Sequence, residues 1–161
     1  MPYRIHGLCF VVIAALATGL PACRAGDSAP APTAELAIVT ASGQTWDYSV
    51  EVADTASLRR RGLMFREVLP TERGMLLLYE SPREANIWMK NTQINLDILF
   101  IDRNGVITRV AANAVPYSET IIRSGGEVRA VLEINGGQAA SRGMREGDRV
   151  IYAPLWPATR Q

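Results

Sequence analysis

A cluster of polar side chains borders one of the most apolar runs of the sequence. The segment Trp88-Met89-Lys90-Asn91-Thr92 leads into the run from Leu96 to Ile101, and Lys90 is the only lysine among 17 basic residues. If this segment is a strand, Trp88 and Lys90 share a face. The ammonium can then make a cation–π contact with the indole, or Trp88, Lys90 and Asn91 can line a ligand site. Stacking of the lysine stem on the ring is the alternative.

Two carboxylates lie inside apolar runs, where an unpaired charge is unfavourable. Asp97 is expected to face solvent or to meet a cation, with Lys90 or an arginine as its partner. Glu133 lies within Val131–Ile134, and a carboxylate on the solvated face of an alternating strand is favoured over a binding role. Both acids are nevertheless candidates for a polar cleft, and they are the acids expected to approach Lys90.

The arginines of Arg59-Arg60-Arg61 resemble a basic patch, but consecutive helical residues point about 100° apart, which predicts a solvated helix face. Arg61 and Arg66 have the guanidinium geometry to bind a carboxylate or phosphate through two hydrogen bonds. Pairing with acids of the same chain is the favoured alternative.

Metal and cofactor chemistry is weakly represented in the sequence. The acidic residues that offer oxygen ligands do not have the spacing of a calcium-binding loop, and they are Asp97, Asp102, Glu133 and Asp148. We expect no metal and no cofactor.

Cysteine and histidine usage excludes several reaction types. The two cysteines are Cys9 and Cys23, and His6 is the only histidine. If residues 1–22 are removed, the remaining chain lacks both histidine and an unmodified cysteine. Catalysis by Ser-His-Asp or Cys-His groups and histidine-based zinc sites are then excluded. Loss of Arg4 also takes the formal charge from +1 to zero, which argues against nucleic-acid binding.

The N-terminal residues have the pattern of a lipoprotein signal peptide. Arg4 precedes an apolar run from Leu8 to Leu20, which is short for a membrane span. The ending Leu20-Pro21-Ala22-Cys23 resembles the lipobox, in which the cysteine is acylated. We therefore predict a signal peptide over 1–22, lipidation of Cys23 and attachment to the periplasmic side of a bacterial membrane. An ordinary signal that releases the protein into the periplasm is the alternative.

The remaining chain is predicted to form a flexible tether over 23–34 and a single β-rich domain over 35–157. Apolar patterning predicts strands over 35–40, 46–52, 74–79, 87–90, 94–101, 106–112, 128–134 and 149–153. Short helices are predicted over 55–61, capped by Asp54, and over 138–142. Many short strands and two short helices indicate a mainly β (α+β) fold, a compact antiparallel β-barrel or sandwich.

Six segments in order resemble the successive motifs of the bacterial and archaeal domain of unknown function 192 family. They are Arg61–Arg66, Gly74–Leu76, Trp88–Thr92, Leu96–Asp102, Val131–Glu133 and Gly147–Val150. The resemblance covers about Val50 to Ile151. It implies a small, mostly β and often secreted fold, and it implies no activity.

Two functions are consistent with these residues. The first is an envelope-anchored, monomeric binding or interaction module whose cleft holds a small polar or anionic ligand or an envelope component. The second is a hydrolase-type enzyme in which Lys90 acts with a serine such as Ser118, or Asp97 acts with Glu133. The binding module needs fewer assumptions, because the enzyme requires a desolvated Lys90 within reach of a hydroxyl.

We predict that replacing Cys23 with serine releases the protein from the membrane. A cysteine that carries the lipid cannot be substituted without loss of the anchor. Fractionation of cells that express each form checks this prediction. Equal amounts of wild type and Cys23→Ser in the soluble periplasm would contradict it.

Overall fold

The computed structural model describes residue 1 and residues 31–158. Most of the predicted signal peptide, Cys23 and most of the tether lie outside the described residues. The elements are β1 (Thr33–Val39), β2 (Thr45–Ala53), α1 (Ala56–Arg61), β3 (Arg73–Ile87), β4 (Leu96–Ile101), β5 (Ile107–Ala114), β6 (Ile122–Asn135), α2 (Gln138–Ser141) and β7 (Arg149–Ile151). Within residues 31–158, no helix is both long and apolar enough to cross a membrane.

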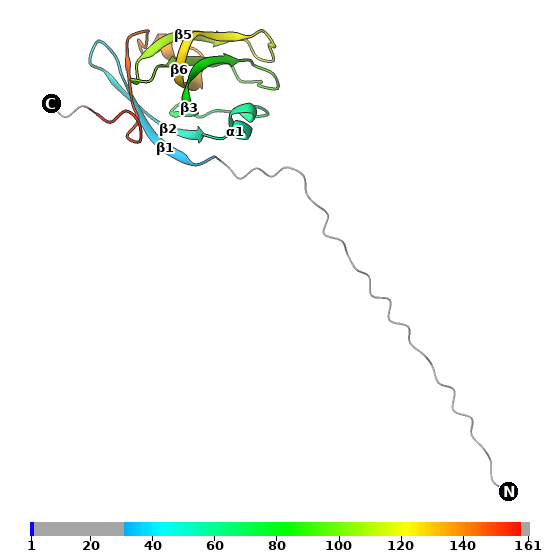
Figure 1. The fold of residues 1–161 in the computed structure, drawn as a ribbon. Coiled ribbons are helices and arrows are strands. Elements are labelled where there is room, and N and C mark those ends of the chain that lie inside the picture. Colours follow the sequence, from blue (N-terminus) through cyan, green and yellow to red (C-terminus); the bar gives the residue numbers. More distant parts are fainter. Residues whose placement is uncertain (2–30, 159–161) are drawn as a thin grey trace.

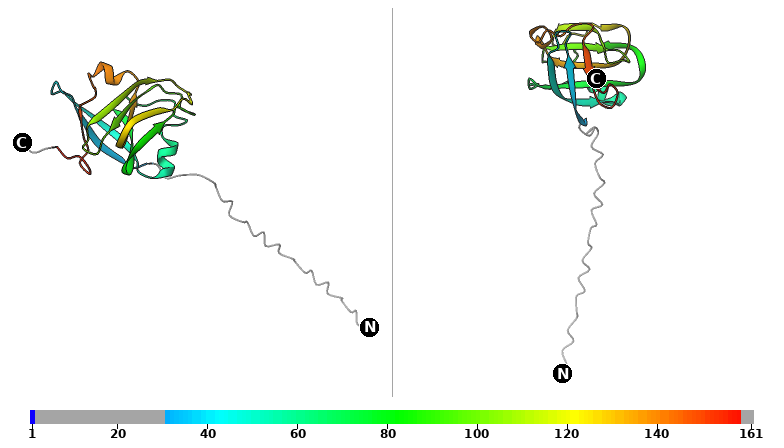
Figure 2. Two further views of the ribbon diagram at one scale, coloured as in Figure 1. Left: turned by 45° about the horizontal axis from the view of Figure 1, so that its top comes forward. Right: turned by 90° about the vertical axis from the view of Figure 1, so that its left-hand side faces the viewer.

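The strands form one curled sheet in the order β5-β4-β6-β3-β2-β1-β7, which closes into a half-barrel (Figures 1 and 2). The predicted mainly β fold with two short helices is therefore confirmed. One strand pair requires a correction, because β2 and β3 run parallel whereas the other pairs are antiparallel. Helix α1 and the loop after it carry the chain back to the start of β2, as a parallel connection requires.

Both faces of the central strands are buried, and strands buried on both faces have nearly continuous apolar runs. On β6, Leu132 and Ile134 face the cluster shared with β1, β2 and β7. Val131 faces a second cluster that includes Leu63 and Leu69, from the segment that follows α1. Alternate residues of one strand thus belong to different cores, and a polar residue in these strands is buried whichever way it points.

Strand β3 is longer than the sequence suggests, because predicted strands over 74–79 and 87–90 become one strand that ends at Ile87. Leu78 pairs with Ala130 and Arg83 pairs with Val128, so four residues of β3 oppose a single residue of β6. Such a bulge bends a strand, and Pro82, which lacks an N–H, lies within it. The second half of β3 therefore curves back across the sheet (Figure 1).

The ends of α1 are set by local polar groups. The N-cap is Thr55 rather than the predicted Asp54, and its hydroxyl accepts a hydrogen bond from the Leu58 N–H at 3.2 Å. Gly62 ends the helix with a positive φ of 49°, as predicted. The helix is only six residues long and has no fully buried residue, and Leu58 packs against the second core.

Asp97 neither faces solvent nor meets a cation, and this expectation was wrong. Its side chain is fully buried, and its two oxygens accept hydrogen bonds from the backbone N–H groups of Asn113 at 2.8 Å and Ala139 at 2.7 Å. Backbone donors satisfy a carboxylate as a cation would, and Ala139 lies in the first turn of α2, where a negative charge is favoured. Asp97 therefore joins β4, β5 and α2.

We predict that Asp97→Asn destabilises the domain by roughly 1–3 kcal/mol, because the amide NH₂ group would face a backbone N–H donor. Thermal melting should record a fall of several degrees. Asp47→Asn, at an exposed position of β2, is the matched control and should melt as wild type does. Equal melting temperatures for Asp97→Asn and Asp47→Asn would contradict this role.

Candidate functional site

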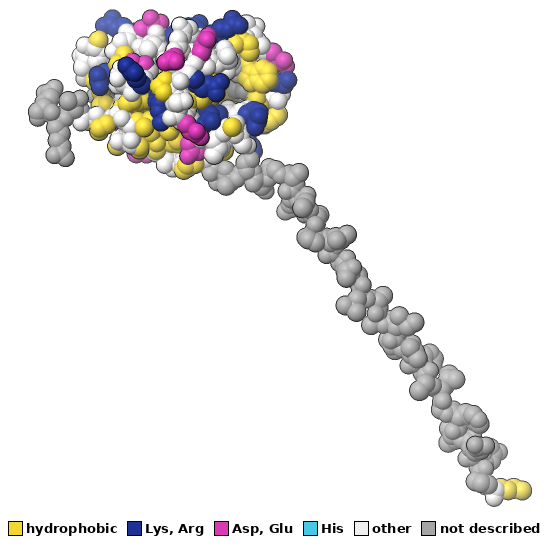
Figure 3. Space-filling model, in the orientation of Figure 1, with side chains coloured by type: hydrophobic (Ala, Val, Ile, Leu, Met, Phe, Trp, Pro, Cys, Tyr) yellow, Lys and Arg dark blue, Asp and Glu magenta, His cyan; other side chains and the backbone are white. Residues whose placement is uncertain are grey.

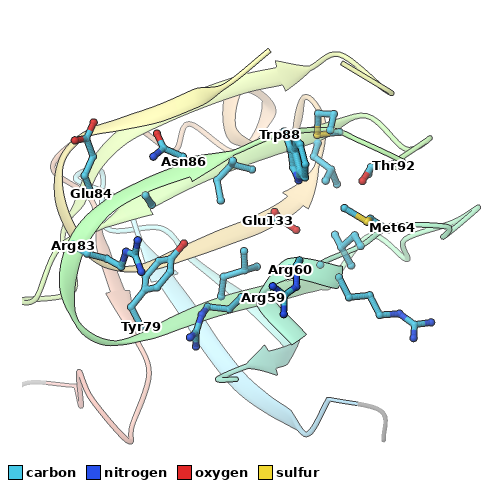
Figure 4. A pocket seen from close by; sticks show the side chains of 18 residues that line it. Arg59, Arg60, Met64, Tyr79, Arg83, Glu84, Asn86, Trp88, Thr92 and Glu133 are labelled. Carbon is cyan, nitrogen blue, oxygen red and sulfur yellow. The ribbon is translucent and has the colours of Figure 1, made fainter. Parts of the chain in front are cut away.

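A pocket of about 320 Å³ lies between α1, the bent strand β3 and the inner face of β6. Figure 4 shows Glu133 at its centre, with Trp88 on one side and Arg59 and Arg60 on the other. The lining residues come from the α1 segment, both halves of β3, the turn after β3, β4 and β6. They are Arg59–Met64, Leu77, Tyr79, Arg83–Met89, Thr92, Leu96 and Glu133.

The bend in β3 creates this space. Leu77 lies before the bulge and Ile87 after it, and both line the same pocket. Helix α1 covers part of the inner face between the two halves of the strand, but its six residues are too few to fill it. A hollow in the second core follows from these two features.

Glu133 lies at the inner end of the pocket, 5% exposed, although a solvated position was the favoured expectation. It pairs with Met75 on β3 and Ile98 on β4, so it points into the second apolar cluster. Burial raises the pKa of its carboxyl from 4.5 to about 7, and no charge or hydrogen bond from residues 31–158 offsets the effect. The expected solvated position was wrong because apolar clusters cover both faces of this part of β6.

Arginine side chains surround the outer end, and we call Arg59, Arg60, Arg61 and Arg83 the arginine rim. The expectation that consecutive arginines of α1 would serve only as a solvated face is incomplete, because all three border the pocket. The Arg59 guanidinium donates to the carbonyls of Asp54 and Leu78. Figure 3 shows Lys and Arg side chains near α1 and the bent part of β3, beside hydrophobic groups.

Tyr79 stands between two members of the arginine rim. The Arg59 and Arg83 guanidinium carbons lie 5.3 Å and 5.6 Å from the centre of its ring, within cation–π range. Burial raises the pKa of the Tyr79 hydroxyl, while the two arginines act in the opposite direction. The phenol therefore stays protonated at neutral pH and is available as a neutral hydrogen-bonding group.

Lys90 lies beside the pocket but does not line it. Its ammonium is 5.1 Å from the Trp88 ring centre, so the predicted contact with the indole is present. Its carboxylate partner is Glu119, at 3.5 Å, and not Asp97 or Glu133. The correction follows from the backbone, because the chain leaves β3 after Ile87 and turns Lys90 outward. With 42% of its side chain exposed, such an ion pair contributes little to stability.

The loops next to the pocket residues Met64 and Thr92 include unusual backbone conformations. Phe65, Asn91 and Tyr117 have positive φ angles, between 55° and 64°. Backbone bonds tie the loops together, from Phe65 N–H to the Asn91 carbonyl at 2.8 Å and from Tyr117 N–H to the Thr92 carbonyl at 3.0 Å. A positive φ is energetically costly for bulky aromatic residues such as Phe65 and Tyr117. Such backbone strain is concentrated at functional regions of proteins.

Asp97 and Glu133 cannot act as a carboxylate pair, because they lie on opposite faces of the sheet. Asp97 pairs with Ile134, while Glu133 pairs with Ile98, and directly paired residues point to the same face. The Ser118 hydroxyl accepts a hydrogen bond from the Thr120 N–H at 3.2 Å, and Ser118 does not line the pocket. Ser118 lies next to the Lys90 segment, since its carbonyl accepts a hydrogen bond from the Met89 N–H at 2.8 Å, but within residues 31–158 the Lys90 ammonium pairs with Glu119 and not with the Ser118 hydroxyl.

The other sequence candidates occupy different places. Trp88 and Arg61 line the pocket, whereas Asn91 is exposed outside it. Arg66 forms an ion pair with Glu51 at 2.6 Å, the internal pairing that was favoured.

The remaining acids considered as metal ligands, Asp102 and Asp148, each accept hydrogen bonds from backbone N–H groups. Asp102 accepts from the N–H groups of Asn104 and Val106, and Asp148 from those of Ala41 and Arg145. Within residues 31–158, no three acidic, histidine or cysteine side chains come together as a metal site.

Several pocket residues were not identified from the sequence, among them Met64, Tyr79, Arg83 and Asn86. The segment from Tyr79 to Asn86 has mixed polarity and contains Pro82, which indicates a loop rather than a strand. The available signal was Pro82 between two strand-like segments, which is typical of a bulge.

Comparison with known proteins identifies the family. The family described as DUF192, Uncharacterized ACR, matches residues 37–152. The chain belongs to the DUF192 family. The segments that resembled DUF192 motifs supply much of the pocket, since Arg61–Met64, Trp88, Leu96 and Glu133 all line it.

Two solved structures of bacterial proteins resemble this DUF192 protein over most of its length. A proposed transcription regulator from Sinorhizobium meliloti 1021 is 41% identical with a TM-score of 0.78, covering 80% of this chain and 99% of its own. A protein of unknown function from Novosphingobium aromaticivorans DSM 12444 is 40% identical with a TM-score of 0.73, covering 78% and 94%. No curated protein matches the chain.

The raised pKa of Glu133 predicts how stability depends on pH. Between pH 4.5 and about 7 the folded protein keeps the Glu133 proton while the unfolded chain has released it, so stability falls as pH rises through this window. The loss attributable to this residue approaches about 3 kcal/mol above pH 7. Glu133→Gln lacks this contribution, and its stability relative to wild type should therefore increase with pH.

Urea unfolding at about pH 5 and about pH 8 measures the effect. Glu84→Gln is the control, since Glu84 lies exposed at the same pocket. An unchanged difference between Glu133→Gln and wild type at the two pH values would show that the carboxyl is not desolvated.

Proposed function

We propose that this domain is a binding module whose pocket holds a small polar ligand. One observation carries the proposal. The Glu133 carboxylate lies at the inner end of a solvent-connected pocket and has no ionic partner within residues 31–158. A buried acid that served only the fold would be expected to have a partner, as Asp97 has, because an unsatisfied carboxylate destabilises the protein. A ligand group that reaches Glu133 would supply the missing partner.

The pocket walls support the same proposal. Leu63, Leu77 and Met89 provide apolar surface, while Tyr79, Asn86 and the arginine rim provide a few polar groups. Small-molecule sites combine apolar walls with converging polar groups, as this pocket does with a larger polar share, and about 320 Å³ is near the lower end of their range. The proposed ligand is therefore of metabolite size.

Binding is favoured over the hydrolase-type alternative. The enzyme needs either a Lys90–serine hydrogen bond or two carboxylates that act together, and the described contacts of Lys90, Ser118, Asp97 and Glu133 include neither. The second acid that borders the pocket, Glu84, is exposed and stands apart from Glu133 in Figure 4.

We also favour a small molecule over a nucleic acid, although one similar structure is described as a proposed transcription regulator. The two described helices have six and four residues. Known DNA readers insert a longer helix or a two-stranded ribbon into the major groove. The formal charge of +1 adds no general attraction for phosphate.

The proposed setting is the periplasmic side of a bacterial membrane, with Cys23 as the lipid attachment point and the domain acting as a monomer. The support comes from the sequence, in which the lipobox-like ending precedes the first residue of β1 by ten positions. The pocket proposal does not depend on this setting.

Native mass spectrometry of the full chain after incubation with a small-molecule extract of bacterial cells tests the proposal. We expect wild type to retain a compound of metabolite size and Asn86→Trp to lose it, because Asn86 is exposed at the pocket and a larger side chain there would obstruct entry. Glu127→Trp is the control, on the exposed part of the neighbouring strand β6 and outside the pocket. Equal retention by both variants, or none by wild type, would contradict the proposal.

A further inference from the structure

The pocket has opposite charges at its two ends. Glu133 lies at the inner end, among Leu63, Leu77 and Leu96, and the arginine rim lies at the outer end. The other acid that borders the pocket, Glu84, is exposed. Figure 4 shows Glu133 deep between the two halves of β3 and Arg59, Arg60 and Arg83 nearer the edge. A ligand that fills the pocket meets a negative field inside and a positive field outside.

The inner end lacks a cation, and there is room for a small one. No arginine or lysine of residues 31–158 forms an ion pair with Glu133. Gly62 lies next to the carboxylate, and a Cβ built on it would stand 3.8 Å from Glu133 Oε2. Its positive φ of 49° disfavours any larger residue, so the end of α1 leaves the carboxylate uncovered on this side. A primary ammonium is compact enough to enter such a space.

The outer end has guanidinium groups that form no ion pair with an acid of residues 31–158. Arg59 is held by two backbone carbonyls, and Arg59 and Arg83 both lie over Tyr79. Arg60 and Arg61 are exposed and form no ion pair within residues 31–158. A guanidinium binds a carboxylate through two parallel hydrogen bonds.

We infer that the ligand is a small amino-carboxylate zwitterion whose ammonium binds Glu133 and whose carboxylate binds Arg60 or Arg61. Its apolar middle packs against Trp88 and Met89. This inference rests on the proposed function and specifies the class of ligand. The volume of the pocket suits a single amino acid or a compound of similar size better than a peptide segment.

Calorimetry with the full chain and three matched probe series tests the inference. The series are ω-amino acids of increasing chain length together with apolar α-amino acids, the corresponding alkylamines, and the corresponding alkanoates. At least one zwitterion should bind about tenfold or more tightly than the amine and the alkanoate matched to it. Chain length is varied because the best probe has to span the distance from Glu133 to the arginine rim.

Two variants assign the contacts. In Glu133→Gln the affinity for the best zwitterion should fall to that of the matched alkanoate, and in Arg60→Gln with Arg61→Gln it should fall to that of the matched amine. Asp47→Asn is the control, exposed on β2 and outside the pocket, and should bind as wild type does. Thermal melting of each variant establishes that it is folded before binding is measured.

The pH profile separates an ammonium from a neutral hydrogen-bonding group. Binding of an ammonium requires ionised Glu133, so affinity should rise with pH up to about 7 and then level off. The other charged or titratable groups around the pocket are the arginine rim, Tyr79 and the exposed Glu84. A ligand that accepted a hydrogen bond from protonated Glu133 would instead bind less tightly as pH rose, and that result would overturn the inference.

Two further outcomes would overturn it and leave the proposed function intact. One is equal binding of alkanoates and zwitterions in wild type and in Glu133→Gln. The other is retention from the cell extract of a compound without an amine, lost in Asn86→Trp, while no zwitterion binds at millimolar concentration. Failure of the proposed function would give a different result, in which Asn86→Trp retains the same compound from the extract as wild type does.

Discussion

Burial of the Glu133 carboxylate places an ionisable group in an apolar face of the sheet without a cation from the described chain. Its charged form is unfavourable there, and its pKa rises to about 7. Asp97 is buried just as deeply on the other face, yet it accepts two short backbone hydrogen bonds. The contrast separates two uses of a carboxylate in one sheet. Asp97 stabilises the fold, whereas Glu133 remains available to a molecule that enters the pocket.

The geometry around Glu133 depends on the bulge in β3. After the extra residues near Pro82 the second half of β3 stays paired with β6, and the bend brings Ile87 and Trp88 to the pocket that α1 also lines. The short helix leaves part of the inner face open, and Gly62 leaves the carboxylate uncovered. The pocket is thus a product of backbone bending.

Much of the fold follows from the sequence, because alternation and continuous apolar runs report burial directly. Val50 and Leu132 lie in the cores that their patterns predict. The path of β3 could not be predicted, since Pro82 and the polar residues around it are equally typical of a loop. The parallel pairing of β2 with β3 also depends on how α1 packs, which local patterns do not encode.

The candidate site was also predicted only in part, because local sequence patterns do not encode contacts across the sheet. Trp88 was identified because it shares a predicted strand face with Lys90, and Glu133 because a carboxylate inside an apolar run is unusual, but their partners depend on contacts across the sheet. Lys90 was assigned to Asp97 or Glu133 and instead contacts Glu119.

The most direct test of this account is an NMR titration of the Glu133 side-chain carboxyl carbon in the ligand-free protein, with Glu133→Gln used to assign the signal. The account predicts a midpoint at about pH 7. A midpoint near pH 4, where an ordinary glutamate titrates, would contradict it.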